Sequence, residues 1–394
     1  MRGPLEGYRV IDTSQMISGP VATRILGDQG ADVIKVEIPG VGDIVRGMGD
    51  KKANMSATFA TANRNKRSVC LNLKKARGLE LLMELVKSAD VFFQNFRPGT
   101  AERMGIGYQD LAEANPALIY VSISGFGEKG PYKHKRVYDP IVQAMSGLAA
   151  IQKNRETGRP NMVRAIIPDK LTAMTAAQAA TAALLARVKT GKGQHIRVSM
   201  LDSMISFLWP ESMSNYTIVD QEPGPTREDI AQDLIFETRD GYITVGTVSD
   251  SEWIGWSRAI KNLELANDAR FNTVGGRIKN VVARLDLMAQ ELKNKTTAEW
   301  LEILDVHEVP CAPVLSREEV VNFPQVVANE LIFESVHPIV GRIRQARGAA
   351  RFEETPGTEL NPAPYLGEHT DEVLAELGLS QEQINILRQN NIVD

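Results

Sequence analysis

The chain has 394 residues, a formal net charge of −4, and 43% hydrophobic against 24% charged residues. This mildly acidic, ordinary composition argues against a general nucleic-acid binder, and the length predicts two domains. The two cysteines, Cys70 and Cys311, form neither a disulfide framework nor a metal-binding spacing, which fits a reducing cytoplasmic setting. The N-terminal stretch lacks the apolar core of a signal peptide. The longest uncharged run, residues 171–186, is shorter than the ~20 apolar residues of a membrane span, so we expect a cytoplasmic protein with a buried helix there.

Apolar patterning predicts alternating strands and helices along the first 200 residues. Strands are expected at residues 8–14, 31–37, 68–73, 90–96 and 116–126. Helices are expected at residues 19–30, 78–89, 101–105 and 169–188, followed by a strand and a helix within 191–209. This alternation predicts an open α/β domain with a parallel sheet, covered by helices on its faces.

The pattern changes after residue 205. Residues 206–232 are polar, contain Pro223 and Pro225, and are predicted to be a linker. Residues 233–329 begin with a predicted hairpin at 237–250 and continue with helical segments, which indicates a smaller α+β domain. The tail from residue 330 has short strands, a proline-rich stretch and a final helix at 371–380.

The opening strand–helix–strand unit raises the question of a dinucleotide site. Gly19 at the helix start and Glu37 at the end of the second strand are partly in keeping with one. The turn reads SQMISGPVATRILG, however, and lacks the G-x-G-x-x-G that lets a backbone approach a pyrophosphate. The unit is therefore interpreted as structural, and hydride transfer with a nicotinamide or flavin cofactor is disfavoured.

Basic residues gather at predicted strand ends. The groups are residues 63–68 with Lys74 and Lys75, Arg97 with Arg103, and Lys133–Arg136. Ligands of open α/β sheets lie outside the carboxyl ends of the strands, where such cations would suit a polyphosphate. The alternative for any one of them is ordinary solvated surface charge.

Asp169 is the only carboxylate in the stretch from Arg164 to Gln194. One interpretation is a helix N-cap, because aspartate is a favoured capping residue. The other is a nucleophile, because a carboxylate kept ionised at a helix N-terminus can attack an activated acyl group. No G-x-S-x-G or H-E-x-x-H motif is present, and the five histidines are scattered, so we predict no metal site.

At this point the sequence resembles the class III CoA-transferases, the CaiB/BaiF family. The matching segments, in family order along nearly the whole chain, are LEGYRVIDTS, SGPVATRILGDQGADVIKVEIPGVGD, NRNKRSVCLNLK, FQNFRPGTAERMGIGY, ALIYVSISGFGEKGPY, YDPIVQAMSGL, TGKGQHIRVSMLD, VPCAPVLS and LGEHTDEVLAELG. The resemblance implies a large Rossmann-like α/β domain built from residues 1–205 and 330–394, a small domain between, and an interlocked homodimer. It also implies CoA and acyl-CoA as substrates, a small carboxylic acid as the second substrate, and no metal or tightly bound cofactor.

The resemblance also implies roles for particular residues. Asp169 would be the catalytic carboxylate that forms an acyl–aspartyl anhydride and then an aspartyl-CoA thioester. The positions that match the family's CoA contacts are Ile17, Ser18, Leu71, Leu73, Lys74, Asn95, Phe96, Arg97, Arg103, Met104, Arg136 and Tyr138. Ile38 departs from relatives with a basic residue there, and Ile17 departs from the glutamine of formyl-CoA transferases.

Two alternatives within the family stay open. The α-methylacyl-CoA racemases use the shared aspartate with a histidine, but that place holds Tyr138, which would be a poor base at neutral pH. A CoA-binding homologue without activity is the second alternative, although the retained Asp169 speaks against it. CoA transfer is therefore the expected activity, and the Arg164 and Lys170 cations beside Asp169 favour a dicarboxylate.

Overall fold

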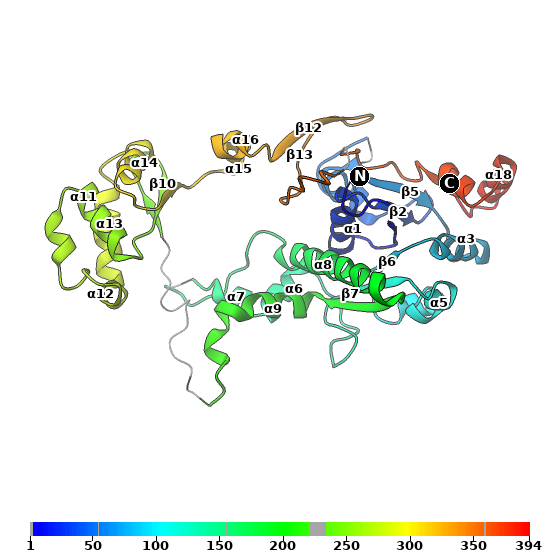
Figure 1. Cartoon of the computed structure of the whole chain (residues 1–394), viewed down its shortest axis with the longest axis horizontal. Helices are drawn as coiled ribbons and strands as arrows, with labels where there is room; N and C mark the ends of the chain where they lie inside the picture. The colour runs from blue at the N-terminus through cyan, green and yellow to red at the C-terminus, as the bar shows by residue number, and fades with distance from the viewer. Residues whose placement is uncertain (1–2, 54, 155, 221, 223–233, 358–359) are drawn as a thin grey trace. The chain divides into compact units, whose positions relative to one another are not determined.

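A six-stranded parallel sheet forms the centre of the larger unit (Figure 1). The spatial order is β5 (Lys66–Cys70), β2 (Asp32–Glu37), β1 (Arg9–Asp12), β6 (Val91–Gln94), β7 (Ile119–Ser124) and β8 (Gln194–Ser199). The order reverses between β1 and β6, and ligands of such sheets bind outside the carboxyl ends of the strands at this switch point. The predicted α/β class with a parallel sheet is confirmed.

The computed structural model describes residues 3–53, 55–154, 156–220, 222, 234–357 and 360–394. These residues divide into a first unit, Met1–Glu211 with Leu331–Asp394, and a second unit, Ser212–Glu330. The predicted linker 206–232 begins inside helix α9 (Met200–Ser212), and its residues 221 and 223–232 lie outside the described part. Both ends of the chain thus contribute to the first unit.

Helices cover both faces of the parallel sheet. Alternate side chains of a strand point to opposite faces, so Val10 packs with one layer and Ile11 with the other. One layer holds α1 (Ser18–Asp28) and α8 (Ile167–Thr190). The other holds α3 (Ala76–Lys87), α5 (Tyr108–Ala114), α17 (Thr370–Glu376) and α18 (Gln381–Gln389), of which α18 had not been predicted.

Shorter elements complete the first unit. They are η1 (Ile44–Gly47), β3 (Lys51–Lys52), β4 (Met55–Ser56), α2 (Ala57–Ala62), α4 (Thr100–Arg103), α6 (Asp139–Met145), α7 (Leu148–Ile151), β12 (Ile332–His337) and β13 (Gly341–Ala346). Several of them follow the carboxyl ends of the sheet strands, where the candidate site lies.

Helix α8 packs closely on α1 because its inner side carries alanines, among them Ala173, Ala176, Ala177 and Ala180. It ends at Gly191, whose left-handed φ of 68° is typical of a helix C-cap. Among the described residues, α8 is the one helix long and apolar enough to cross a membrane, but its alanine side is buried in the core of its own unit.

The N-cap of α8 is Ile166, so Asp169 lies in the first turn of the helix and does not cap it. Pro168 accounts for the earlier start, because proline is well suited to the first turn, where its missing N–H costs nothing. The expectation that Asp169 is an N-cap was therefore wrong. Its side chain is left available for another role.

The second unit has its own sheet and core. The antiparallel strands are β9 (Ile235–Glu237), β10 (Tyr242–Val245) and β11 (Cys311–Pro313), and the predicted hairpin pairs Glu237 with Tyr242. The helices are η2 (Ser214–Tyr216), α11 (Asp250–Ala259), η3 (Leu263–Asn267), α12 (Val274–Lys279), α13 (Val281–Leu292), α14 (Thr297–Val306), α15 (Arg317–Asn322) and α16 (Pro324–Ala328). Three buried tryptophans, Trp253, Trp256 and Trp300, centre the core.

Candidate active site

Asp169 meets Ser18, which lies 151 positions earlier in the chain. The two come together because α8 packs on α1 and both helices begin at the same edge of the sheet. The hydroxyl and the backbone N–H of Ser18 lie beside the Asp169 carboxylate and act on its pKa as hydrogen-bond donors. Ile17 is the buried N-cap residue of α1 and directly precedes Ser18. The structure thus brings Ile17, Ser18 and Asp169 to one place.

Asp139, the first residue of α6, contacts the backbone of Asp169. Its Oδ2 accepts a hydrogen bond from the backbone N–H of Asp169 at 3.3 Å, and the Asp139 side chain is 3% exposed. Gln143 donates to Oδ1 of Asp139 at 2.6 Å, and its own oxygen accepts from the backbone N–H of Val163. The segment that leads into α8 is therefore tied to α6. Sequence reasoning had missed Asp139 and Gln143, although both lie in the quoted segment YDPIVQAMSGL.

Burial raises the pKa of Asp169 above its ordinary value of 3.8, and the neighbouring charge of Asp139 raises it further. The hydroxyl and backbone N–H of Ser18 act in the opposite direction, because donors beside the carboxylate stabilise its ionised form. A partly buried carboxylate with these neighbours loses much of its hydration. The Ser18 donors beside it favour its ionised form, which is the nucleophilic one.

Asn95 joins the loop after β6 to the loop after β1. Its Oδ1 accepts from the backbone N–H of Gln15 at 2.9 Å, and its Nδ2 donates to the Gln15 carbonyl at 2.6 Å. These loops flank the switch point between β1 and β6. The Asn95 amide is thus structural, and of the two residues that follow it Phe96 is partly buried and Arg97 is exposed.

A cavity of about 250 Å³ opens beside the loop after β6. Its lining includes the predicted residues Phe96 and Arg97, together with Lys133 and His134 from the loop after β7. Among the described residues, Arg97 and Lys133 have no carboxylate partner for their side chains. Cations left unpaired at the carboxyl edge of a sheet are suited to phosphate groups.

The remaining predicted contacts divide by accessibility. Leu73, Phe96 and Met104 are partly buried, and each packs against the same hydrophobic core. Leu71 is fully buried in that core, so its side chain cannot contact a ligand and only its backbone is available. Lys74 is exposed beside Leu73.

Two predicted arginines lie on neighbouring loops. Arg103 is exposed and donates to the Thr100 hydroxyl at 2.9 Å. Arg136 is exposed and has no side-chain partner among the described residues. The structure does not connect Arg136 to the other predicted residues by any direct contact. The loop that carries Arg136 leads from β7 to Tyr138 and Asp139, and Asp139 accepts a hydrogen bond from the backbone N–H of Asp169.

The basic cluster at residues 63–68 is structural, which corrects the expectation that it faces a polyphosphate. Arg64 pairs with Asp28 at 2.7 Å, and the buried Lys66 pairs with Asp12 at 2.9 Å. Arg67 is bound by several carboxylates, among them Asp32. These residues stand at the amino end of β5, whereas the cluster at Lys133–Arg136 follows the carboxyl end of β7.

Tyr138 is the N-cap residue of α6, and 67% of its surface is exposed. It directly precedes Asp139, so it lies at the Asp169 site, while the nearby His134 is exposed on the loop. His195, which is partly buried, hydrogen-bonds with the Ser122 hydroxyl at 2.8 Å. Burial and the charge of Arg197 lower the pKa of His195 to about 4, so it is neutral at physiological pH.

The chain is similar to known proteins over nearly its whole length. The model of CoA-transferase family III matches residues 5–370. Succinyl-CoA:glutarate CoA-transferase of Mus musculus is 36% identical over 95% of this chain and 86% of that protein. Formyl-CoA:oxalate CoA-transferase of Streptomyces avermitilis is 34% identical over the full length of both. The crystal structure of a CaiB/BaiF family protein from Brucella suis superimposes with a TM-score of 0.84 at 31% identity, covering 96% of this chain and all of that one.

The chain therefore belongs to CoA-transferase family III. This membership confirms the resemblance drawn from the sequence segments, and it confirms CoA transfer as the class of reaction. The protein is an acyl-CoA:carboxylate CoA-transferase by class. Its nucleophile, substrates and assembly are separate questions.

Proposed function

We propose that this enzyme moves CoA between carboxylic acids through covalent intermediates on Asp169. The observation that carries the proposal is the partly buried Asp169 carboxylate itself, with the donor groups of Ser18 beside it at the start of α1. It stands at the carboxyl edge of the sheet, on the same edge as the accessible cations Arg97 and Lys133. Carboxylate, donors and cations together suit an acyl-CoA whose thioester faces Asp169.

The steps balance without any further reagent. The Asp169 carboxylate attacks the donor thioester carbonyl, the C–S bond breaks, and an acyl–aspartyl anhydride and CoA thiolate form. The thiolate attacks the aspartyl carbonyl and releases the donor acid, which leaves an aspartyl-CoA thioester. The acceptor carboxylate attacks that carbonyl and releases the thiolate, which then attacks the acceptor's acyl carbon and frees Asp169. The N–H groups at the start of α1 are suited to the oxyanions of these steps.

We propose a dicarboxylate as the acid substrate. Arg164 and Lys170 flank Asp169 in the chain, both are exposed, and neither has a carboxylate partner among the described residues. The two relatives are named for glutarate and oxalate, both dicarboxylates. A second carboxylate that pairs with Arg164 would anchor the acid while its first carboxylate reacts.

Trapping tests the covalent mechanism. The protein is incubated with succinyl-, glutaryl-, acetyl- or propionyl-CoA, treated with hydroxylamine or borohydride, and the peptide that contains Asp169 is weighed. A donor-dependent mass change on Asp169 supports the proposal, and a change on another residue contradicts it. Acceptor choice is then measured with succinate and glutarate against butyrate. Arg164→Gln should lower kcat/KM for the dicarboxylates and leave that for butyrate unchanged, with Arg159→Gln as the control on the same loop.

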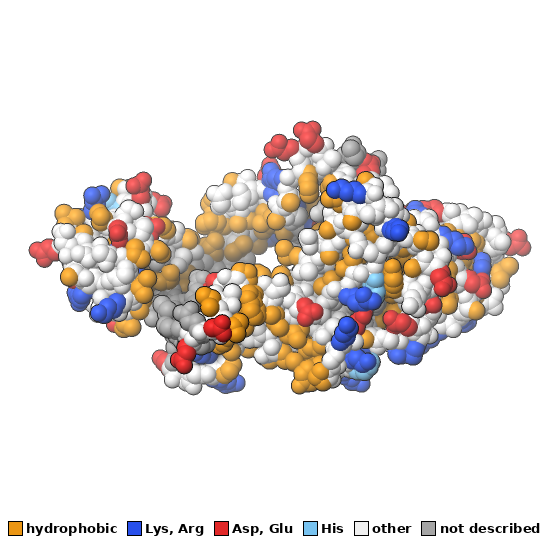
Figure 2. Space-filling model, turned by 60° about the horizontal axis from the view of Figure 1, so that its bottom comes forward, with side chains coloured by type: hydrophobic (Ala, Val, Ile, Leu, Met, Phe, Trp, Pro, Cys, Tyr) orange, Lys and Arg blue, Asp and Glu red, His pale blue; other side chains and the backbone are white. Residues whose placement is uncertain are grey.

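We also propose a homodimer for the active state. Figure 2 shows hydrophobic side chains gathered on the face of the first unit that comes forward from the bottom of Figure 1. Exposed apolar residues of α8 and α9 include Met174, Leu185, Val188, Phe207 and Trp209. An apolar surface of this kind favours association. Sedimentation equilibrium at micromolar concentration checks this, and a monomer with full activity would refute it.

A further inference from the structure

The loop before Ser18 has a backbone conformation that its own residues do not favour. Residues 13–17 join β1 to α1, and Met16 has a φ of 69°, in the left-handed region that residues other than glycine rarely adopt. The N-cap residue Ile17 makes no side-chain hydrogen bond to the helix. A strained, uncapped loop keeps one shape only when surrounding groups impose it.

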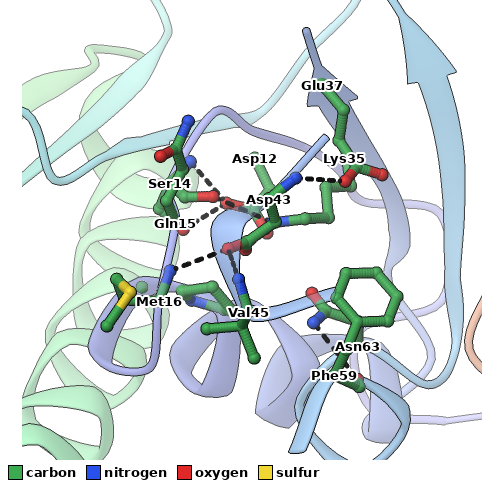
Figure 3. A network of polar contacts seen from close by, with 12 residues as sticks. Asp12, Ser14, Gln15, Met16, Lys35, Glu37, Asp43, Val45, Phe59 and Asn63 are labelled. Carbon is green, nitrogen blue, oxygen red and sulfur yellow. Dashed lines mark hydrogen bonds and ion pairs between the residues drawn. The ribbon is translucent and has the colours of Figure 1, made fainter. Parts of the chain in front are cut away.

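Besides the Asn95 bonds to Gln15, buried charged groups hold the loop on either side of that residue (Figure 3). The backbone N–H of Ser14 donates to Asp12 Oδ1 at 2.9 Å, and the Ser14 carbonyl accepts from Lys35 Nζ at 2.9 Å. The N–H of Met16 donates to Asp43 Oδ1 at 3.2 Å. Lys35 and Asp43 also bind each other at 3.0 Å, and their side chains are 1% and 0% exposed. One buried ion pair thus holds the loop at two points.

This pair belongs to a larger buried network. Its charged members are Asp12, Lys35, Glu37, Asp43, Arg46 and Lys66. The three carboxylates and three cations cancel in formal charge. Apolar residues can often replace such networks without loss of stability, so buried ion pairs are weak stabilisers. A role in fixing local geometry explains this arrangement better than a role in stability.

Lys35 carries a positive charge at neutral pH. Burial alone would lower its pKa, but Asp12, Asp43 and Glu37 outweigh burial and raise the pKa above the ordinary value. Lys66 approaches the loop from β5 and donates to Asp12 at 2.9 Å. Burial lowers the pKa of Lys66 to about 8.

We propose that Lys35 and Asp43 are positioning residues for the nucleophile. They fix the backbone at Ser14 and Met16, and so set where Ser18 meets the carboxylate of Asp169. The inference rests on the proposed function, because the position of Ser18 affects the rate only if Asp169 reacts. It goes beyond that function, since neither residue touches the substrate.

Four variants test the proposal. Lys35→Met and Asp43→Ala remove the two contacts to the loop, whereas Asp43→Asn keeps an oxygen for the Met16 N–H. Arg46→Met is the matched control, because Arg46 is buried in the same network and makes no bond to residues 13–17. We expect Lys35→Met and Asp43→Ala to lower kcat about 10- to 100-fold with KM for acyl-CoA within about twofold, as for a misplaced catalytic group. Asp43→Asn should recover most of the loss, and Arg46→Met should keep kcat per folded molecule.

A second measurement uses no substrate. The pKa of Asp169, followed by NMR in protein labelled with ¹³C-aspartate, should rise in Lys35→Met and Asp43→Ala because the Ser18 hydrogen bonds weaken. It should not move in Arg46→Met. Unchanged pKa and kcat in the folded Lys35→Met protein would overturn the proposal. If Lys35→Met does not fold, equal kcat and equal Asp169 pKa in Asp43→Ala and Asp43→Asn overturn it instead. Failure of the proposed function is distinct, since it appears as no trapped adduct on wild-type Asp169.

Discussion

Two substitutions beside Asp169 should move its pKa in opposite directions. Ser18→Ala removes the hydroxyl that donates to the carboxylate, and Asp139→Asn removes a neighbouring negative charge while keeping an oxygen for the Asp169 N–H. A hydrogen bond to a charged group contributes about 1.5–3 kcal/mol, and one pKa unit corresponds to about 1.4 kcal/mol. Ser18→Ala should therefore raise the Asp169 pKa and lower kcat/KM on the acid limb by about 10- to 100-fold. A like charge nearby disfavours the ionised carboxylate, so Asp139→Asn should lower the Asp169 pKa.

The assay is the pH dependence of kcat/KM for acyl transfer between pH 4 and 8. In the proposed mechanism the ionised Asp169 carboxylate is the active form, so activity should fall as the pH drops through the Asp169 pKa. Since that pKa is raised, the wild-type acid limb should lie above 3.8. Ionisations of the acyl-CoA itself are common to all variants and cancel in the comparison. Equal shifts in the same direction, or no shift in either variant, would refute the assignment of Ser18 and Asp139 as opposing influences on Asp169.

Three further predictions concern stability and the loop. Asp169→Asn should form no trapped adduct yet raise the melting temperature at pH 7, because a raised folded-state pKa means that the ionised form costs stability above it; a lower melting temperature would contradict this. Gly19→Ala should abolish activity, since a Cβ there would lie 2.2 Å from the Ser14 side chain, and wild-type rates in this variant would show the loop to be tolerant. The lowered pKa values of Asp12 and Glu37 stabilise the fold above about pH 4, and this stabilisation is lost as the pH falls through the folded-state values; Asp12→Asn should weaken the pH dependence of urea unfolding below pH 4, and an unchanged dependence would exclude this role for Asp12.

Local patterns predicted the parallel sheet and the long helix, because strands and helices each have a characteristic spacing of apolar residues over a few positions. The strand RVID and the helix that begins beside Asp169 were identified on that basis. The partnership of Ser18 with Asp169 has no such signal, because it arises from the packing of α1 on α8. Only the resemblance to a family had placed both residues at one site.

The sequence did contain a sign of the buried charged network, but its basic residues were interpreted as facing a ligand or solvent. A cluster such as NRNKRS looks like surface charge, yet Lys66 is fully enclosed and paired. The strand DVIKVE places Lys35 and Glu37 on one face, two positions apart, within an otherwise apolar segment. Charges inside a strand that must be buried on both faces indicate partners elsewhere in the chain. Which partners they are depends on the order of the strands, and spacing alone does not supply that.

Because alanines let α8 pack closely on its neighbours, any change in their size would tilt the helix and move Asp169 at its N-terminal end. Twenty-four residues span about 36 Å, so a tilt of about 3° around the far end moves the first turn by about 2 Å. A misplacement of about 1 Å can cost a hundredfold in rate. A larger side chain at Ala180 or Ala183, about three to four turns from Asp169, would push α8 away from its neighbours and move Asp169 away from Ser18. Substitution of Ala180 or Ala183 by a larger residue should therefore lower activity, although both positions are far from Asp169.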